Sequence, residues 1–279
     1  MTVAVLSGKG GTGKTFISVS LAAVAGQATY LDCDVEEPNG RLFLKPEQVV
    51  SEPVTVLVPV FDQAACTGCR QCVAFCRFSA LAFVKDKPMV FPEICHSCGG
   101  CALVCPEKAI TEIPRQAGVV EEGMCGDIRV VTGILNVGEA SAVPAISQVL
   151  RRNPQDSGLT VVDCPPGSSC SVMESVSQAD YCLLVAEPTA FGLHNLKMVH
   201  RLVRLLQKPC GIVINKADGA YPPLDQFCAE TNTPVLLRLP YSTHIAERTA
   251  VGAVAVWEDA ALADAFNGLL ASIRKEVVQ

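Results

Sequence analysis

A glycine-rich segment near the N-terminus limits the possible folds of this chain more than any other feature. Residues 8–15 read GKGGTGKT, directly after the apolar run VAVLS and directly before a stretch with helical spacing of apolar residues. The pattern G-x-x-x-x-G-K-[ST] between a strand and a helix forms a loop whose backbone N–H groups surround phosphate oxygens. We therefore predict a phosphate-binding loop between the first strand and the first helix.

Much of the chain alternates between predicted strands and predicted helices. Apolar runs bounded by turn residues predict strands at residues 3–6, 28–31, 54–60, 159–162, 181–186, 211–214 and 235–239. Apolar residues at three-and-four spacing predict helices at residues 14–25, 140–152, 193–206 and 260–273. Such alternation predicts the α/β class, with a doubly wound and mainly parallel P-loop NTPase sheet.

A cysteine-rich segment interrupts this alternation and repeats itself. Two strings share the spacing C-x2-C-x2-C-x3-C, and their members are Cys66, Cys69, Cys72 and Cys76, then Cys95, Cys98, Cys101 and Cys105. An internal repeat of this kind indicates a module inserted into the host sheet. We predict a P-loop domain in two parts, residues 1–60 and 116–279, with the inserted module at residues 61–115.

Composition and charge argue against several classes of protein. The formal net charge of −6 disfavours a nucleic-acid surface, which normally gathers Lys and Arg. No apolar run approaches the roughly 20 residues of a membrane span, and Met1 leads into glycines rather than an export signal. The 15 cysteines are an odd number, which favours reduced thiols that bind metal over a disulfide framework. We expect a cytoplasmic protein without stable membrane insertion.

The loop residues indicate how a nucleotide binds. Glycines let the backbone turn its N–H groups inward, and the following helix adds its positive N-terminus. Lys14 is expected to contact the terminal phosphates, and the Thr15 hydroxyl to ligate Mg²⁺. The predicted phosphate-binding set is Gly8, Lys9, Gly10, Gly11, Thr12, Gly13, Lys14 and Thr15.

The second residue of the loop narrows the family. Lys9 between Gly8 and Gly10 gives KGGTGKT, which resembles the deviant Walker A signature of the MinD, ParA and nitrogenase iron protein ATPases. The resemblance implies that Lys9 reaches the phosphates of a partner subunit, in a homodimer or a heterodimer with a related ATPase. A lysine supplied in this way stabilises charge on the transferring phosphoryl group.

Two predicted strands end in carboxylates, where α/β sheets bind ligands. YLDCDVEEPN contains Asp32 and Asp34, and TVVDCPPG contains Asp163. The first segment resembles the family's switch I, which implies that Asp34 positions the attacking water and that Asp32 lies nearer the metal. The second resembles the Walker B and switch II segment, which implies that Asp163 holds Mg²⁺ through water. An ordinary strand-end cap is the alternative for each site.

Two downstream segments resemble base-binding loops of the same family. GIVINKAD supplies Asn215 and Lys216, and LPYS supplies Pro240 on the adenine side. The first segment also fits the N-K-x-D pattern, in which Asp218 reads guanine. The phosphate loop favours ATP, and GTP is the alternative nucleotide.

The cysteine spacing is that of bacterial ferredoxins, in which three close thiolates hold one cubane and the fourth cysteine binds the other. By that rule one [4Fe-4S] cluster takes Cys66, Cys69, Cys72 and Cys105, and the second takes Cys76, Cys95, Cys98 and Cys101. The module is accordingly predicted to be an α+β bacterial-ferredoxin-like domain. Zinc is the alternative, because four thiolates also suit tetrahedral Zn²⁺.

Three residues near these motifs carry secondary predictions. Arg77 stands where the ferredoxin pattern has proline, so it either raises the potential of the second cluster, marks a docking face or is a tolerated substitution. His96 is expected at the surface. Cys170 follows Asp163 by the step that precedes a cluster ligand in the nitrogenase iron protein, but the other ligand segment reads NVGEASAVPAI and lacks cysteine. A subunit-bridging cluster is therefore disfavoured.

The whole chain resembles MinD-superfamily ATPases with an inserted ferredoxin domain, a group that includes ATPases of the orange protein complex. The favoured function is an ATPase that couples nucleotide-dependent dimerisation to the clusters, for electron transfer with a redox partner protein or for redox-gated action. An iron-sulfur assembly or carrier ATPase is one alternative, disfavoured because ferredoxin-spaced cubanes are held permanently. A MinD-like positioning ATPase, with the clusters as sensor, is the other. Its basic membrane helix is missing here, since the final helix offers only Arg274 and Lys275.

Overall fold

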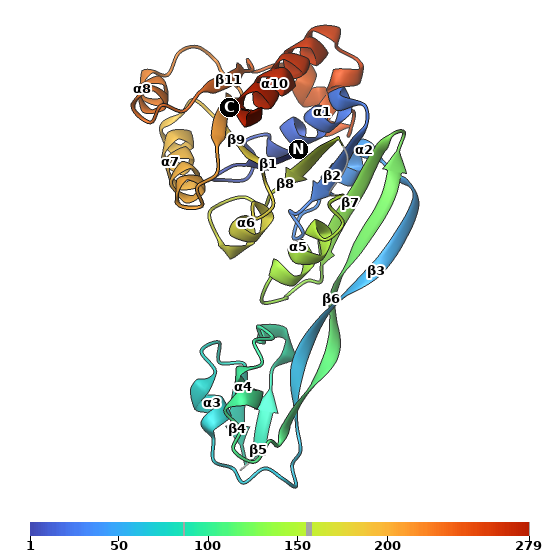
Figure 1. The fold of residues 1–279 in the computed structure, drawn as a ribbon, viewed down its shortest axis with the longest axis vertical. Coiled ribbons are helices and arrows are strands. Elements are labelled where there is room, and N and C mark those ends of the chain that lie inside the picture. The colour runs from blue at the N-terminus through green and yellow to red at the C-terminus, as the bar shows by residue number, and fades with distance from the viewer. Residues whose placement is uncertain (86, 155–157, 279) are drawn as a thin grey trace.

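The computed structural model describes residues 1–85, 87–154 and 158–278. Within these residues, nine strands form one sheet in the order β11-β10-β9-β1-β8-β2-β7-β6-β3 (Figure 1). Every neighbouring pair from β11 to β7 is parallel, which confirms the predicted mainly parallel α/β sheet. These strands are β1 (Thr2–Leu6), β2 (Ala28–Asp32), β7 (Ile128–Leu135), β8 (Leu159–Asp163), β9 (Tyr181–Ala186), β10 (Cys210–Ile214) and β11 (Val235–Arg238).

Helices cover both faces of the sheet and bury two apolar cores. Alternate residues of β1 point to opposite faces, so that Val3 and Val5 join one core while Ala4 and Leu6 join the other. The first core packs under α1 (Lys14–Ala25) and α10 (Ala260–Val278), and the second under α5 (Val143–Leu150), α6 (Cys170–Ser175), α7 (Ala190–Leu205) and α8 (Pro222–Glu230). Shorter helices are α2 (Gly40–Leu44), α9 (Thr243–Ala250) and the 3₁₀ helix η2 (Ala255–Trp257).

An antiparallel ribbon leaves one edge of the sheet (Figure 1). It consists of β3 (Glu47–Phe61) and β6 (Ile110–Cys125), and β6 also pairs with β7. The predicted strand at residues 54–60 is confirmed as part of β3, but it pairs antiparallel with β6 at the sheet edge and is buried on one face only. Val54, Val56 and Val58 are buried while Thr55 and Leu57 are exposed, which is the alternation of a strand covered on one face.

The cysteine-rich segment forms the far tip of the ribbon (Figure 1). It contains α3 (Gln71–Phe75), the hairpin of β4 (Leu81–Val84) and β5 (Lys87–Val90), the 3₁₀ helix η1 (Pro92–Ile94) and α4 (Gly100–Leu103). The chain leaves the ribbon at Phe61 and rejoins it at Ile110, directly opposite. The predicted boundaries at 61 and 115 thus fall at the end of β3 and inside β6.

No helix in the described part of the chain combines the length and the apolar character that a transmembrane segment requires.

Candidate nucleotide site and cysteine cavities

The phosphate loop joins β1 to α1, and two of its glycines are required by close packing. Gly13 has φ = 91°, and a Cβ there would lie 2.2 Å from Nδ2 of Asn215. A Cβ on Gly8 would lie 2.4 Å from the carbonyl oxygen of Asn195. A side chain at Gly8 would displace the backbone at Asn195, and one at Gly13 would displace the Asn215 amide, so the shape of the loop depends on both glycines.

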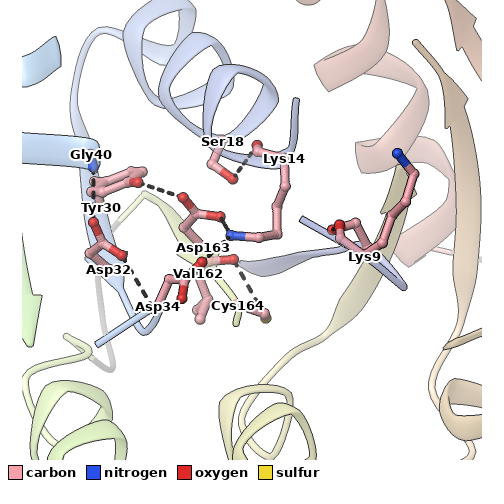
Figure 2. A network of polar contacts seen from close by, with 11 residues as sticks. Lys9, Lys14, Ser18, Tyr30, Asp32, Asp34, Gly40, Val162, Asp163 and Cys164 are labelled. Carbon is pink, nitrogen blue, oxygen red and sulfur yellow. Dashed lines mark hydrogen bonds and ion pairs between the residues drawn. The ribbon is translucent and has the colours of Figure 1, made fainter. Parts of the chain in front are cut away.

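Lys14 lies at the centre of a buried polar network (Figure 2). Its Nζ donates to Asp163 Oδ1 at 2.7 Å and to Asp34 Oδ2 at 3.2 Å. Burial lowers the pKa of Lys14, but the carboxylates of Asp163 and Asp34 outweigh it and raise this pKa above its ordinary value. Lys14 is therefore a fixed positive charge between two of the predicted carboxylates.

Asp32 completes the acidic side of the network. Its Oδ2 accepts the backbone N–H of Gly40 at 3.0 Å, and its Oδ1 accepts that of Asp34 at 3.2 Å. Burial and the charge of Asp163 raise the pKa of Asp32 well above its usual range. Burial also raises the pKa of Asp34, although Lys14 opposes it. The three carboxylates have more oxygen atoms than the one ammonium group of Lys14 can bind. Carboxylate oxygens are ligands that suit Mg²⁺.

Tyr30 belongs to this site, although no sequence motif marks it. Its hydroxyl donates to Asp163 Oδ2 at 2.9 Å, and the whole side chain is buried. Asp163 is therefore held by Tyr30 on one oxygen and by Lys14 on the other. The period of two along β2 places Tyr30 on the same face as Asp32, but this alternation does not identify Asp163 as its partner.

Lys9 points away from Lys14 and pairs within its own chain (Figure 2). Its Nζ lies 2.7 Å from Glu187 Oε2, and the Nζ of Lys216 lies 2.7 Å from Glu187 Oε1. Lys216 also donates to the carbonyl of Gly11 at 2.7 Å. Burial raises the pKa of Glu187, but hydrogen bonds from Lys216 and Lys9 outweigh this and lower it. Glu187, unmarked by any motif, ties the phosphate loop to the segment after β10.

A cavity of about 840 Å³ opens beside the phosphate loop. Predicted nucleotide contacts that line it are Gly10, Gly11, Gly13, Lys14, Thr15, Asp34, Asn215, Lys216 and Pro240. Leu42, Tyr241 and Val251 add apolar surface to the lining. Asn215 is fixed to the loop by donating from Nδ2 to the Thr12 carbonyl at 2.8 Å. Asp218, which the guanine alternative requires, is absent from the described lining.

Two smaller cavities at the tip of the ribbon are each lined by four cysteines. One contains Cys66, Cys69, Cys72 and Cys105, and the other contains Cys76, Cys95, Cys98 and Cys101. These are the two sets that the ferredoxin spacing predicts. Burial raises the pKa of the Cys101 thiol to about 11. Across the described residues, no three Cys, His, Asp or Glu side chains already surround one point as ligands of a metal ion.

Comparison with known proteins agrees with the geometry of the nucleotide site. The family model of the CobQ/CobB/MinD/ParA nucleotide binding domain matches residues 3–255. The chain belongs to this family. The MinD/ParA-type chain is 32% identical over 209 residues to the uncharacterized protein MJ0578 of Methanocaldococcus jannaschii. The aligned residues make up 72% of this chain and 73% of that protein.

Two further matches are a solved structure and a protein that is similar over a short stretch of the chain. The septum site-determining protein MinD of Pyrococcus horikoshii, solved in complex with Mg-ADP, has a TM-score of 0.60 and 18% identity, with 98% of this chain and 96% of that chain covered. A stretch of 56 residues, 20% of the MinD/ParA-type chain, is 39% identical to one subunit of the Na(+)-translocating ferredoxin:NAD(+) oxidoreductase complex of Acetobacterium woodii, and it covers 17% of that protein.

Arg77, His96 and Cys170 lie at the surface of this MinD/ParA-type protein. Arg77 is exposed, and His96 is exposed as predicted and stacks on Phe78 with ring centroids 3.7 Å apart. Cys170 is exposed at the start of α6. A bridging cluster at Cys170 stays a disfavoured prediction.

Proposed function

We propose that this MinD/ParA-type protein is a Mg²⁺-dependent ATPase that couples its nucleotide state to two [4Fe-4S] clusters. One observation carries the proposal: a single chain combines the Lys14 network beside a cavity of about 840 Å³ with two four-cysteine cavities. The larger cavity falls in the range of about 300–1,000 Å³ that small-molecule sites occupy.

Each residue of the nucleotide site has a proposed task. Backbone N–H groups of the loop and Lys14 bind the phosphates of ATP. Thr15, Asp32 and Asp163 hold Mg²⁺, which when bound neutralises charge on the phosphates. Asp34, whose side chain is 16% exposed, orients the attacking water. Asn215, Lys216 and Pro240 contact the adenine.

Lys9 is proposed to act in a dimer. In the single chain its ammonium group is held by Glu187, with 24% of its side chain exposed. Release from Glu187 lets Lys9 reach the phosphates bound by a partner subunit, which is either a second copy or a related ATPase. Charge on the transferring phosphoryl group is then stabilised only when two subunits meet.

We further propose an inserted ferredoxin-like domain at residues 61–115, between ATPase parts 1–60 and 116–279. The two cysteine sets and the local likeness to a ferredoxin:NAD(+) oxidoreductase subunit support it. Four thiolates in each set fit a [4Fe-4S] cluster, which when bound supplies one-electron transfer. We propose a cytoplasmic protein, where its thiols stay reduced, and a redox partner protein that exchanges electrons with the clusters. Its resemblance to ATPases of the orange protein complex is proposed on the same grounds.

The decisive experiment measures coupling in anaerobically purified protein. ATP hydrolysis is followed with the clusters oxidised and then reduced, and the cluster spectra are recorded with and without Mg-ATP. We expect the hydrolysis rate to change with cluster oxidation state and the spectra to change with nucleotide. Identical rates and identical spectra in a preparation that binds both groups would contradict the coupling. The Lys14→Ala variant controls for hydrolysis by contaminants.

A further inference from the structure

Arg115 connects the cysteine-rich tip to the sheet through two separate acceptors. It lies on β6, opposite Val56 of β3. Its Nη1 and Nη2 donate to Oε1 and Oε2 of Glu139 at 2.5 and 2.7 Å, and Nη2 also donates to the carbonyl of Pro92 at 3.2 Å. A forked pair of this kind fixes the orientation of both partners as well as their separation.

The two acceptors belong to different parts of the molecule. Pro92 begins η1, which leads directly into Cys95, the first cysteine of the second string. Glu139 lies in the connection between β7 and α5, and its side chain is only 8% exposed. The same connection is held to the ribbon by Asn136, whose backbone N–H donates to the Ala117 carbonyl at 2.9 Å. A shift of this connection therefore reaches η1 through Arg115.

The connection is in turn packed toward the nucleotide site. It continues into α5, where Ser147 Oγ donates to Glu174 Oε1 of α6 at 2.5 Å. Val149 of α5 and Val172 of α6 are fully buried in the same core. The segment that leads from Asp163 to α6 is anchored at Gly167, whose N–H donates to the carbonyl of Ser7 before the phosphate loop at 2.9 Å.

We infer that Arg115 is a positioning residue that transmits the nucleotide state of the Asp163 segment to the second cysteine string. The inference rests on the proposed function. Contiguous packed elements carry displacements when they have alternative arrangements, and side-chain hydrogen bonds of Ser147 and Arg115 link α6, α5, the Glu139 connection and η1 in series. Glu139 stays with Arg115 during such a shift, because separation leaves a mostly buried carboxylate unpaired.

Hydrogen–deuterium exchange on the full-length, anaerobically purified protein tests the inference. Backbone exchange of residues 92–98 is compared without nucleotide, with Mg-ADP and with a non-hydrolysable ATP analogue. We expect a nucleotide-dependent difference of about fivefold or more in wild type, the lower end of allosteric couplings. Arg115→Gln is expected to remove most of this difference. Arg115→Lys, which keeps the charge but lacks the fork, is expected to restore only part of it.

The matched control is Arg129→Gln. Arg129 makes the same two kinds of contact away from the tip, pairing with Glu122 at 2.8 Å and donating to the Arg152 carbonyl at 2.7 Å. Nucleotide affinity and thermal stability, measured in both variants, report any general damage. If Arg115→Gln fails to fold, Glu139→Gln removes the same ion pair and is measured in its place.

Each outcome decides the question. Loss of the difference in Arg115→Gln, with wild-type affinity and a normal response in Arg129→Gln, supports the inference. An Arg115→Gln protein that keeps the wild-type difference overturns it and leaves the proposed function standing. A wild-type protein that binds nucleotide without any change at residues 92–98 also overturns it. Failure of the wild type to bind nucleotide or iron overturns the proposed function as well.

Discussion

The two fully buried tyrosines of the sheet allow a matched test of the Asp163 network. Tyr30 donates its hydroxyl to the Asp163 carboxylate at 2.9 Å. The hydroxyl of Tyr181 is also buried, but it has no hydrogen-bond partner among the residues that the structure describes. Replacing each by phenylalanine removes the same atom from two different environments.

The expected effects differ in size and in sign. A hydrogen bond to a charged acceptor contributes about 1.5–3 kcal/mol, so Tyr30→Phe should lower the free energy of unfolding by about 2 kcal/mol. With an unfolding slope of about 3 kcal/mol per molar urea, the midpoint falls by about 0.7 M. Tyr181→Phe should leave the midpoint unchanged or raise it slightly, because an unpaired buried hydroxyl is itself unfavourable.

Urea unfolding of the nucleotide-free protein, followed by fluorescence, measures both effects. Trp257 is the only tryptophan and lies in η2, which packs against α1 and α10, so the signal reports the nucleotide half of the chain. Equal shifts in the two variants would refute the reasoning. The same result would mean that the hydroxyl of Tyr30 does not stabilise Asp163.

Three further predictions concern Asp32, Cys101 and Lys9. Burial and the charge of Asp163 raise the folded pKa of Asp32, so its contribution to stability is complete below its unfolded value and is lost as the pH rises through the folded one. Nucleotide-free wild type should lose urea stability more steeply than Asp32→Asn as the pH rises above the unfolded aspartate pKa of about 3.9, and equal slopes would argue against this origin. Cys101→Ser should lower bound iron from about eight to about four per chain, whereas Cys228→Ser, a buried cysteine of the host core, should leave iron and acid-labile sulfide unchanged. Lys9→Ala should bind ATP normally yet hydrolyse it about 10³-fold more slowly, with Lys197→Ala on α7 as the control; a rate near wild type would exclude a phosphate contact.

Local signals in the sequence predict the nucleotide half well. The strand before the phosphate loop and the helix after it occur where the motif predicts them. They can be predicted because the spacing of apolar residues and the positions of glycines depend on only a few adjacent residues. Asp32 and Asp163 are the last residues of β2 and β8, Asp34 lies two residues beyond β2, and parallel pairing of the two strands brings them together around Lys14.

Long-range pairing explains what the sequence does not reveal. β6 mixes glycines such as Gly118 and Gly123 with glutamates, so its pattern predicts no strand until β3 pairs with it. Tyr30 and Glu187 enter the site through partners far away in the chain, as Arg115 does at the ribbon. A single side chain in a strand or loop carries no local sign of such a partner.

The register of the ribbon makes the cysteine-rich tip separable from its host. Phe61 and Ile110 are the last paired residues of the β3–β6 ribbon. The residues between them therefore leave and re-enter the ribbon at neighbouring positions. A tight two-residue turn grafted at that pair would shorten the arm without altering any strand of the parallel sheet. The cysteine-rich tip can therefore be removed or replaced while the parallel sheet of the nucleotide half keeps its strands.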